Sequence, residues 1–111
     1  MKHLSSYVGN TPLIPIKLGE LTVWGKCEFM NPSGSVKDRM ATYILNDAER
    51  RGIIKPGDTL VEATSGNTGI AFSMLAAQRG YKIYIIMPEN MSEERKRMMK
   101  LYNANIIEVD A

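Results

Sequence analysis

The pattern of apolar and polar positions divides the first half of the chain into a hairpin and a helix. Residues 21–28 alternate with the two-residue period of a strand, and the short link 18–20 indicates a hairpin with the segment before it. That segment, residues 7–16, contains two prolines, so any strand in it is expected at a sheet edge. Apolar residues then recur at helical spacing over 36–51, and Gly52 is a usual residue just past a helix end.

The second half of the chain predicts strands and helices in alternation. Residues 59–63 and 82–87 are short apolar runs typical of buried strands, and the nearly all-apolar stretch 70–77 predicts a buried helix between them. A further helix is expected over 91–102 and a last strand over 105–109. From the second strand of the hairpin onward the order is β-α-β-α-β-α-β, which predicts an α/β fold with a parallel sheet covered by helices.

The helix expected over 91–102 carries a run of charges that we interpret as a solvated face. Ser92 is the expected N-cap, and acidic residues near the start with basic residues near the end suit the helix dipole. Glu93 and Arg97 are spaced four residues apart, as a favourable ion pair requires. The apolar face is expected to combine Met91, Met98, Leu101 and Tyr102.

Length and charge exclude several classes of partner. At 111 residues the chain can form one small domain with a modest core. Its net charge is +2 with acids and bases interspersed, which gives no case for a nucleic-acid partner. No apolar run approaches the ~20 residues of a membrane span, and the N-terminus lacks the apolar core of a signal peptide. We therefore expect no membrane partner and a cytoplasmic location.

The chain has one cysteine and one histidine, which excludes an intramolecular disulfide and gives no metal-ligand cluster. Cys27 is expected to be a small buried strand residue. A nucleophilic role has little support, because no histidine lies near it in the sequence.

A lysine stands where a sharp loop turns into the first predicted helix. Pro32 and Gly34 end the preceding strand, and Ser35 is a good N-cap, so Lys37 falls in the first helical turn. A cation there opposes the positive end of the helix dipole, at a cost of ~0.3–1 kcal/mol at an exposed site. Asp38, beside it, is an ordinary residue for a first turn. A lone lysine is more often a solvated surface residue than a catalytic one, and the residues alone leave that interpretation open.

The stretch 64–69 lies between a predicted strand and a predicted helix, where α/β proteins bind ligands. Its hydroxyls, its glycine and the free amides of a helix start suit a carboxylate or a phosphate. The alternative is that Thr64, Ser65 or Asn67 merely caps the helix, and from the residues alone the two interpretations are about equal. The chain contains neither of the glycine motifs of nucleotide-binding folds, so a nucleotide site has no support.

Residues 31–39 resemble the lysine motif of the pyridoxal-phosphate enzymes of the β-replacement family, the cysteine synthases and cystathionine β-synthases. In that family this lysine bonds covalently to pyridoxal 5'-phosphate. Residues 62–71 resemble the family's substrate loop, which grips the α-carboxylate of the amino-acid substrate, while its asparagine contacts the phenolic oxygen of the cofactor. The resemblance implies substrate roles for Thr64, Ser65, Gly66, Asn67 and Thr68, a catalytic and cofactor-binding role for Lys37, and a cofactor contact for Asn67.

The resemblance covers almost all of the chain, because residues 9–13 and 87–95 also resemble cysteine synthase. Details of the lysine motif are similar to the second bacterial isozyme of O-acetylserine sulfhydrylase, the cysteine synthase B type. The implied enzyme is a homodimer of fold type II, with the architecture of the tryptophan synthase β subunit. It would replace the acetate of O-acetylserine, or of a related activated serine, by sulfide or another thiol to form cysteine.

The resemblance also implies a division into domains. Residues 1–35 would be a strip of the larger domain, and residues 36–111 a smaller mobile domain that need not be complete. The family's phosphate-binding cup, and the hydroxyl partner of the pyridine nitrogen, lie further along the chain than Ala111. The alternative is a non-catalytic truncated or split module that docks onto a complementary fragment or onto the C-terminal tail of serine acetyltransferase.

Overall fold

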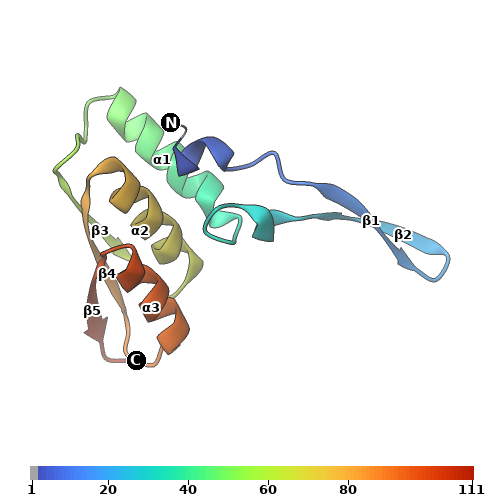
Figure 1. Ribbon diagram of the computed structural model, residues 1–111. Coiled ribbons are helices and arrows are strands. Elements are labelled where there is room, and N and C mark those ends of the chain that lie inside the picture. Colours follow the sequence, from blue (N-terminus) through green and yellow to red (C-terminus); the bar gives the residue numbers. More distant parts are fainter. Residues whose placement is uncertain (1–2) are drawn as a thin grey trace.

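The structure, a computed structural model, describes residues 3–111 and consists of a body of helices and strands with a long projecting arm (Figure 1). Its elements, in chain order, are η1 (Leu4–Tyr7), β1 (Leu13–Leu18), β2 (Leu21–Lys26), η2 (Glu28–Met30), α1 (Lys37–Arg50), β3 (Thr59–Ala63), α2 (Asn67–Arg79), β4 (Lys82–Pro88), α3 (Glu93–Leu101) and β5 (Asn105–Val109).

The arm is the expected hairpin. β1 and β2 pair antiparallel along their whole length, and Gly19 takes a positive φ of 61° in the two-residue turn between them. Nearly every side chain of both strands is exposed, including Trp24 at 61%. The alternation in the sequence therefore does not mark one buried face, because nothing among residues 3–111 covers either side of the arm.

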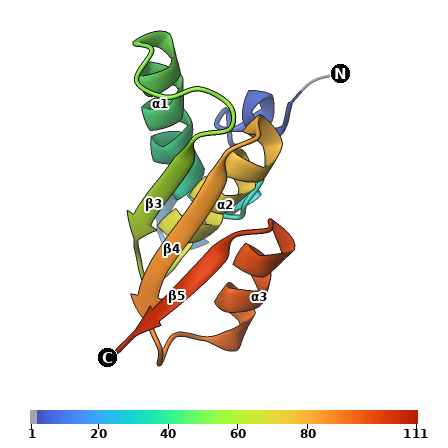
Figure 2. The ribbon, with the colours of Figure 1, turned by 90° about the vertical axis from the view of Figure 1, so that its left-hand side faces the viewer.

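The body contains a parallel sheet in the order β3-β4-β5. Figure 2 shows the sheet in front of the helices, with α1 behind β3 and α2 behind β4. The α/β class with a parallel sheet is thus confirmed, with one correction. β2 was expected to begin the parallel series, but it pairs only with β1, so the parallel sheet of the described residues has three strands.

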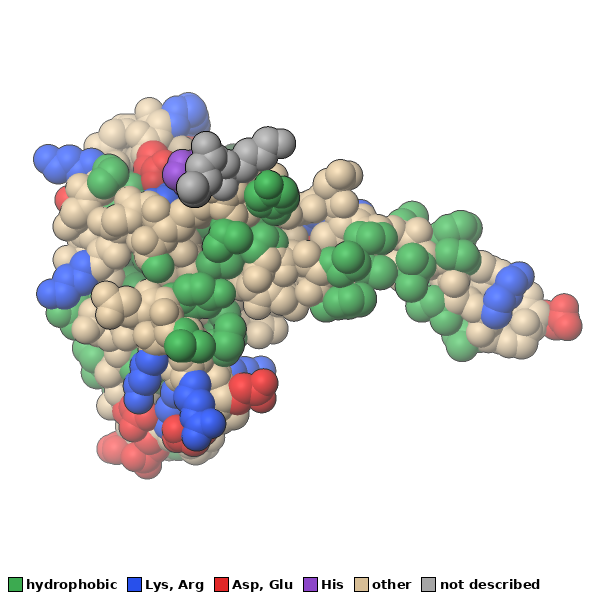
Figure 3. All heavy atoms as spheres, in the orientation of Figure 1, with side chains coloured by type: hydrophobic (Ala, Val, Ile, Leu, Met, Phe, Trp, Pro, Cys, Tyr) green, Lys and Arg blue, Asp and Glu red, His purple; other side chains and the backbone are tan. Residues whose placement is uncertain are grey.

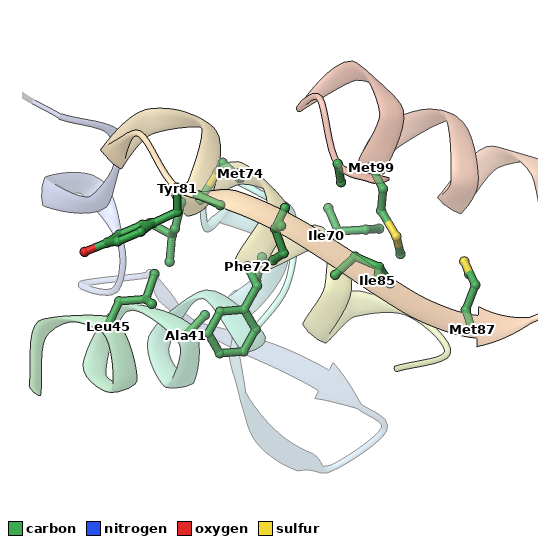
Figure 4. Packing of buried hydrophobic residues seen from close by; sticks show 14 residues of the cluster. Ala41, Leu45, Ile70, Phe72, Met74, Tyr81, Ile85, Met87 and Met99 are labelled. Carbon is green, nitrogen blue, oxygen red and sulfur yellow. The ribbon is translucent and has the colours of Figure 1, made fainter. Parts of the chain in front are cut away.

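The core lies between the sheet, chiefly β4, and the helices α1, α2 and α3 on one side of it. Alternate residues of β4 are buried, and α2 is buried from Gly69 to Ala76. Figure 4 shows Phe72 of α2 pointing toward Ala41 of α1, and Met99 of α3 beside Ile70. The expectation of a buried α2 is confirmed. Cys27, 5% exposed and free, is buried as expected.

Helix ends follow the sequence signals closely at the C-termini. Past the end of α1, the amide of Gly52 donates to the Glu49 carbonyl at 3.0 Å and the amide of Ile53 donates to the Ala48 carbonyl at 2.9 Å. Gly52 has a φ of +70°, so this is the two-bond glycine cap that the sequence indicates. Gly80 ends α2 in the left-handed conformation as well.

The charged helix α3 differs from its prediction in which residues it buries. Its N-cap is Ser92 as expected, with the Ser92 hydroxyl accepting from the Arg95 amide at 3.4 Å. However, Leu101 is 79% exposed, whereas Met99, not assigned to the apolar face, is fully buried against the core. The other three residues of the predicted face, Met91, Met98 and Tyr102, are partly buried against the core as expected, so only Leu101 was assigned wrongly.

The charge run on α3 is not wholly solvated, which corrects the sequence interpretation. Lys96 is 5% exposed, and its amine lies 2.7 Å from the Glu108 carboxylate of β5 and donates to the Glu89 carbonyl at 2.8 Å. Glu93 lies 3.5 Å from Lys96 rather than pairing with Arg97. The Lys96 ammonium lowers the pKa of Glu108, and Glu108 in turn raises the pKa of Lys96, so the pair joins α3 to β5.

In the described part of the chain, no helix has the length and apolar character needed to cross a membrane. Residues 3–111 also hold no group of three or more histidine, cysteine or carboxylate side chains that could bind a metal ion.

Candidate functional site

The lysine lies at the end of a loop that is fixed by its own side chains. A turn at 31–34 closes through the Gly34 amide, which donates to the Asn31 carbonyl at 2.8 Å, and Gly34 has a φ of +97°. Ser35 precedes α1, and its hydroxyl accepts from the Lys37 amide at 3.2 Å. The helix begins at Lys37, one residue later than expected, with Lys37 in the first turn as predicted.

Asp38 does more than the sequence suggests. It is fully buried, and its carboxylate accepts from the Ser33 amide at 2.7 Å and from the Ser33 hydroxyl. The acid that favours the helix dipole therefore also folds the loop back onto the first turn of α1. Its neighbour Lys37 is exposed, and no carboxylate of residues 3–111 lies within 4.0 Å of its amine. The amine is open to a carbonyl reagent.

A polar cluster joins the base of the arm to α1 just behind this loop. The Arg39 guanidinium contacts the Glu28 carboxylate at 2.8 and 3.1 Å, and it also donates to the Thr11 hydroxyl at 3.3 Å. Hydrogen bonds from Arg39, then from Thr11, lower the pKa of Glu28 to about 2. The buried Asn31 side chain completes the cluster by donating to Glu28 and accepting from the Gly9 amide at 2.8 Å.

The second loop, residues 64–66, leads from β3 into α2. The helix begins at Asn67, three residues earlier than the expected Ile70, so Asn67 and Thr68 belong to its first turn. Polar residues of modest helix propensity made this turn look like loop in the sequence. Among residues 3–111, no side chain caps α2, and the amides of Asn67, Thr68 and Gly69 have no acceptor. The interpretation that this stretch only caps its own helix is therefore wrong.

The peptide unit between Ser65 and Gly66 is held from both sides. The Gly66 amide donates to the Thr64 hydroxyl at 3.3 Å, and the Ser65 carbonyl accepts from the Arg95 guanidinium of α3 at 3.1 Å. Gly69 has a separate reason to be glycine. A Cβ there would lie 2.7 Å from the Thr64 methyl and 2.9 Å from the Met99 terminal methyl, so its absence lets α2 pack closely.

The structure brings the two loops to the same end of the helical layer. α1 and α2 lie side by side with their N-termini at the same end (Figure 1). Ser33 of the lysine loop and Asn67 of α2 line one surface cavity of about 600 Å³. Its other lining residues are Ile70, Met91, Ser92, Glu94, Arg95 and Met98. All six candidate residues thus lie at or beside the starts of α1 and α2.

A cavity of similar volume, about 670 Å³, lies near the C-terminal ends of α1 and α2 and contains none of the predicted site residues. It is lined by His3, Glu49 and Arg79 among others, and Arg79 is paired with Glu49 at 3.2 Å. Because it contains none of the predicted site residues and its Arg79 and Glu49 are already paired, we give it less weight than the cavity at the helix starts.

The sequence reasoning missed the contribution of α3 to the site. Met91, Ser92 and Arg95 line the cavity beside Asn67, although they lie at least 24 positions further along the chain. The signal that could have found them is the resemblance of residues 87–95 to cysteine synthase. Asp38 was also missed as a loop-closing group, because its partner Ser33 precedes it and nothing in the sequence shows where its carboxylate points.

Comparison with known proteins agrees with the fold and the loops. The family of pyridoxal-phosphate dependent enzymes matches residues 4–111. The chain is 51% identical over 111 residues to cysteine synthase B of Salmonella typhimurium and 48% identical over 113 residues to cystathionine beta-synthase of Apis mellifera. Both matches cover 96% of this chain. They cover 37% of the length of the cysteine synthase and 22% of the length of the cystathionine beta-synthase. A crystal structure of O-ureido-L-serine synthase superposes with a TM-score of 0.94 at 39% identity, covering 99% of this chain and 36% of the other.

The chain therefore belongs to the pyridoxal-phosphate dependent enzyme family. Its fold is part of the fold-type II architecture of these enzymes, as the resemblance implied. The chain spans about a third of the length of the cysteine synthase that it matches.

The residues at the two helix starts fit two of the functional groups of pyridoxal phosphate. The cofactor carries an aldehyde, which needs an accessible amine, and Lys37 supplies an exposed one without an ion pair among residues 3–111. It also carries a phenolic oxygen, for which the exposed Asn67 side chain offers a donor. Neither residue is engaged by the rest of the described chain in a way that would prevent this.

Proposed function

We propose that this chain is the N-terminal part of an enzyme that exchanges the β-substituent of an activated serine, such as O-acetylserine, for sulfide or another thiol to form cysteine. The observation that carries the proposal is the arrangement at the two helix starts. An exposed amine at the start of α1 lies at the same end of the layer as an uncapped helix start on α2. The names of the relatives, a cysteine synthase and a cystathionine beta-synthase, support the same class of reaction.

In this proposal the loop 64–68 binds the substrate carboxylate. The free amides of Asn67 and Thr68, at the positive end of the α2 dipole, are donors for an anion. Hydroxyls of Ser65 and Thr68 can add to these bonds, and Gly66, without a side chain, leaves room for the Arg95 guanidinium beside the loop. The Asn67 side chain would turn toward the phenolic oxygen of the cofactor. The orientation of the substrate then follows from groups held on rigid helix starts rather than on a free loop.

Lys37 has two tasks in the proposed reaction. Its amine would hold the cofactor aldehyde, and as a free amine it would take the proton from the substrate α-carbon. The bound cofactor supplies an electron sink for that carbon. Acetate leaves the β-carbon with its bonding electrons, the thiol sulfur bonds to the β-carbon, and Lys37 returns a proton to the α-carbon. The balance is one O-acetylserine and one hydrogen sulfide for one cysteine, one acetate and one proton.

The test is the replacement of this one amine in a complete enzyme that carries residues 1–111. Lys37→Ala should lower β-replacement by a factor of 10³ or more, roughly the loss expected when a residue acting as both nucleophile and base is removed. Lys55→Ala, an exposed lysine between α1 and β3, is the matched control and should keep the parent rate. Turnover by Lys37→Ala near that of the control would overturn the assignment.

We further propose the division into a strip of the larger domain, residues 1–35, and a smaller mobile domain, residues 36–111. The support is the arm, whose apolar side chains are exposed on both strands and gather along its surface in Figure 3. Such a surface favours burial against other protein. The homodimeric state of the complete enzyme is proposed on the family resemblance alone, and its cytoplasmic location is an expectation from the sequence.

The exposed arm also supports the alternative, a non-catalytic module that docks onto a complementary fragment or onto a serine acetyltransferase tail. The two proposals differ in whether residues 1–111 bond to added pyridoxal phosphate: a change in the cofactor absorbance supports the enzyme part, and no change supports the docking module. We expect weak cofactor binding, no appreciable cysteine synthesis and self-association of this chain, measured by absorbance, cysteine assay and light scattering. Robust turnover by the chain alone would contradict both the docking module and the need for further cofactor-binding groups.

A further inference from the structure

Arg95 is the only charged side chain that the structure places in hydrogen-bond contact with the loop 64–66 within residues 3–111. It extends from the first turns of α3, across 30 sequence positions, to the Ser65 carbonyl at 3.1 Å. Its guanidinium lies against Gly66 so closely that a Cβ on Gly66 would be 3.1 Å from the Arg95 Cζ and 3.2 Å from Nη1. The contact is therefore with the backbone at the very start of α2.

This placement is electrostatically unfavourable unless an anion is present. No carboxylate of residues 3–111 lies within 4.0 Å of the guanidinium. The positive charge instead faces the positive end of the α2 dipole, where three amides already lack acceptors. Arginine cannot relieve this by losing its proton. A bound carboxylate would compensate both the guanidinium and the amides.

The same contact fixes the orientation of a peptide unit. The plane between Ser65 and Gly66 has its carbonyl held by Arg95 and its amide held by the Thr64 hydroxyl. If the carbonyl were released, the plane could rotate and bring a partial negative charge toward the free amides of α2. Such a rotation would oppose anion binding at that helix start.

We propose that Arg95 is a positioning residue for the carboxylate-binding loop, which holds the Ser65 carbonyl on the α3 side and adds positive charge at the start of α2. This inference rests on the proposed function, because it assumes that loop 64–68 binds the substrate carboxylate. A Cβ at position 66 would lie 3.1 Å from the Arg95 Cζ, so glycine there lets the guanidinium pack closely against the loop. Arg95 itself need not touch the substrate.

The experiment compares Arg95→Ala, Arg95→Lys and the control Arg97→Ala in the complete enzyme. Arg97 is exposed on the same helix and makes no ion pair among residues 3–111. Arg95→Ala should raise KM for the amino-acid substrate about tenfold or more, because the Ser65 carbonyl loses the charge-assisted hydrogen bond that orients it and the start of α2 loses a positive charge. The value of kcat should change by less than about threefold because the reacting groups are untouched. Arg95→Lys should recover part of the loss, since it keeps the charge without the planar fork.

A second readout does not depend on turnover. In the complete enzyme, the amide resonances of Asn67 and Thr68 should shift on titration with acetate, and Arg95→Ala should weaken this binding severalfold while Arg97→Ala leaves it unchanged. Equal KM values for Arg95→Ala and Arg97→Ala, or a fall in kcat alone, would overturn the role of Arg95. If Lys37→Ala still abolishes turnover in that case, the proposed function stands and only the positioning role fails.

Discussion

The starts of α1 and α2 are built in opposite ways although they lie side by side. At α1, side chains close the backbone: the Ser35 hydroxyl takes the Lys37 amide, and the buried Asp38 carboxylate takes both donors of Ser33. At α2, no side chain of residues 3–111 takes the first amides, and the flanking contacts hold the loop away from them. The start of α1, which we call closed, leaves the Lys37 side chain as its exposed functional group. The start of α2, which we call open, leaves backbone amides as free donors.

Removing the side-chain hydrogen bonds at the start of α1 should have the largest effect on stability. Asp38→Ala leaves the Ser33 amide without its acceptor, and we expect the free energy of unfolding to fall by about 1–3 kcal/mol, the cost of an unsatisfied buried donor. Asp47→Ala, on the same helix but paired at the surface with Arg50 and Arg51, should change it by less than about 1 kcal/mol. Urea unfolding measures both. Equal midpoints would mean that Asp38 does not close the loop.

The next largest effect on stability is expected when a side chain is added at Gly69, in the first turn of α2. Alanine is a better helix former than glycine by about 1 kcal/mol, yet Gly69→Ala should destabilise the protein, because its Cβ would meet the Thr64 methyl at 2.7 Å and Met99 at 2.9 Å. Adding Thr64→Ser removes that methyl and should restore part of the melting temperature. A Gly69→Ala variant that melts above the parent would show that α2 is not packed this tightly.

Substitutions in the first turn of α2 should weaken substrate binding but leave the free energy of unfolding nearly unchanged. The exposed Asn67 and the half-buried Thr68 make no side-chain hydrogen bond among residues 3–111, so Asn67→Ala or Thr68→Ala should change the free energy of unfolding by less than about 0.5 kcal/mol. Affinity for the amino-acid substrate should fall about tenfold, by the loss of one bond to a charged group. Thr22→Ala on the arm is the control. Parallel losses of melting temperature and affinity would instead indicate a structural role.

The smallest expected effect concerns the cluster behind the closed start. Because the folded pKa of Glu28 is lowered from 4.5 to about 2, its stabilising contribution is complete above the unfolded pKa and is lost as pH falls through the range between these values. The melting temperature of the parent should therefore fall more steeply from pH 4.5 to 2 than that of Glu28→Gln. Glu20→Gln, in the exposed turn of the arm, should follow the parent. Identical curves for all three would show that the ionised Glu28 does not join the arm to α1.

Much of this comparison was accessible from the sequence, because local signals decide it. The hairpin, the alternation of strands and helices, the glycines that end α1 and α2 and Ser92 as N-cap all follow from nearby residues. The place of Lys37 in a first turn follows in the same way. The family resemblance then indicated what the residues alone leave open, namely that loop 64–68 forms one site together with Lys37.

The features that the sequence did not predict depend on contacts between residues that are distant in the chain. Lys96 is buried because Glu108 of β5 lies next to it, and no spacing within α3 indicates that partner. Periodicity placed Leu101 rather than Met99 toward the core, and only the seating of α3 on α2 decides between them. β2 has the alternation of a sheet strand, yet whether it joins the parallel sheet is a question of topology. Arg95 reaches the loop before α2 through tertiary packing alone.

The central claim is that the amine presented at the closed start of α1 is the group that bonds to pyridoxal phosphate. The direct measurement is to incubate the complete enzyme with the cofactor, reduce it with borohydride, digest it and locate the pyridoxyl group by peptide mass spectrometry. We predict a single labelled lysine, Lys37, with the label lost in Lys37→Ala. A label on another lysine, or equal labelling of several exposed lysines, would contradict the account.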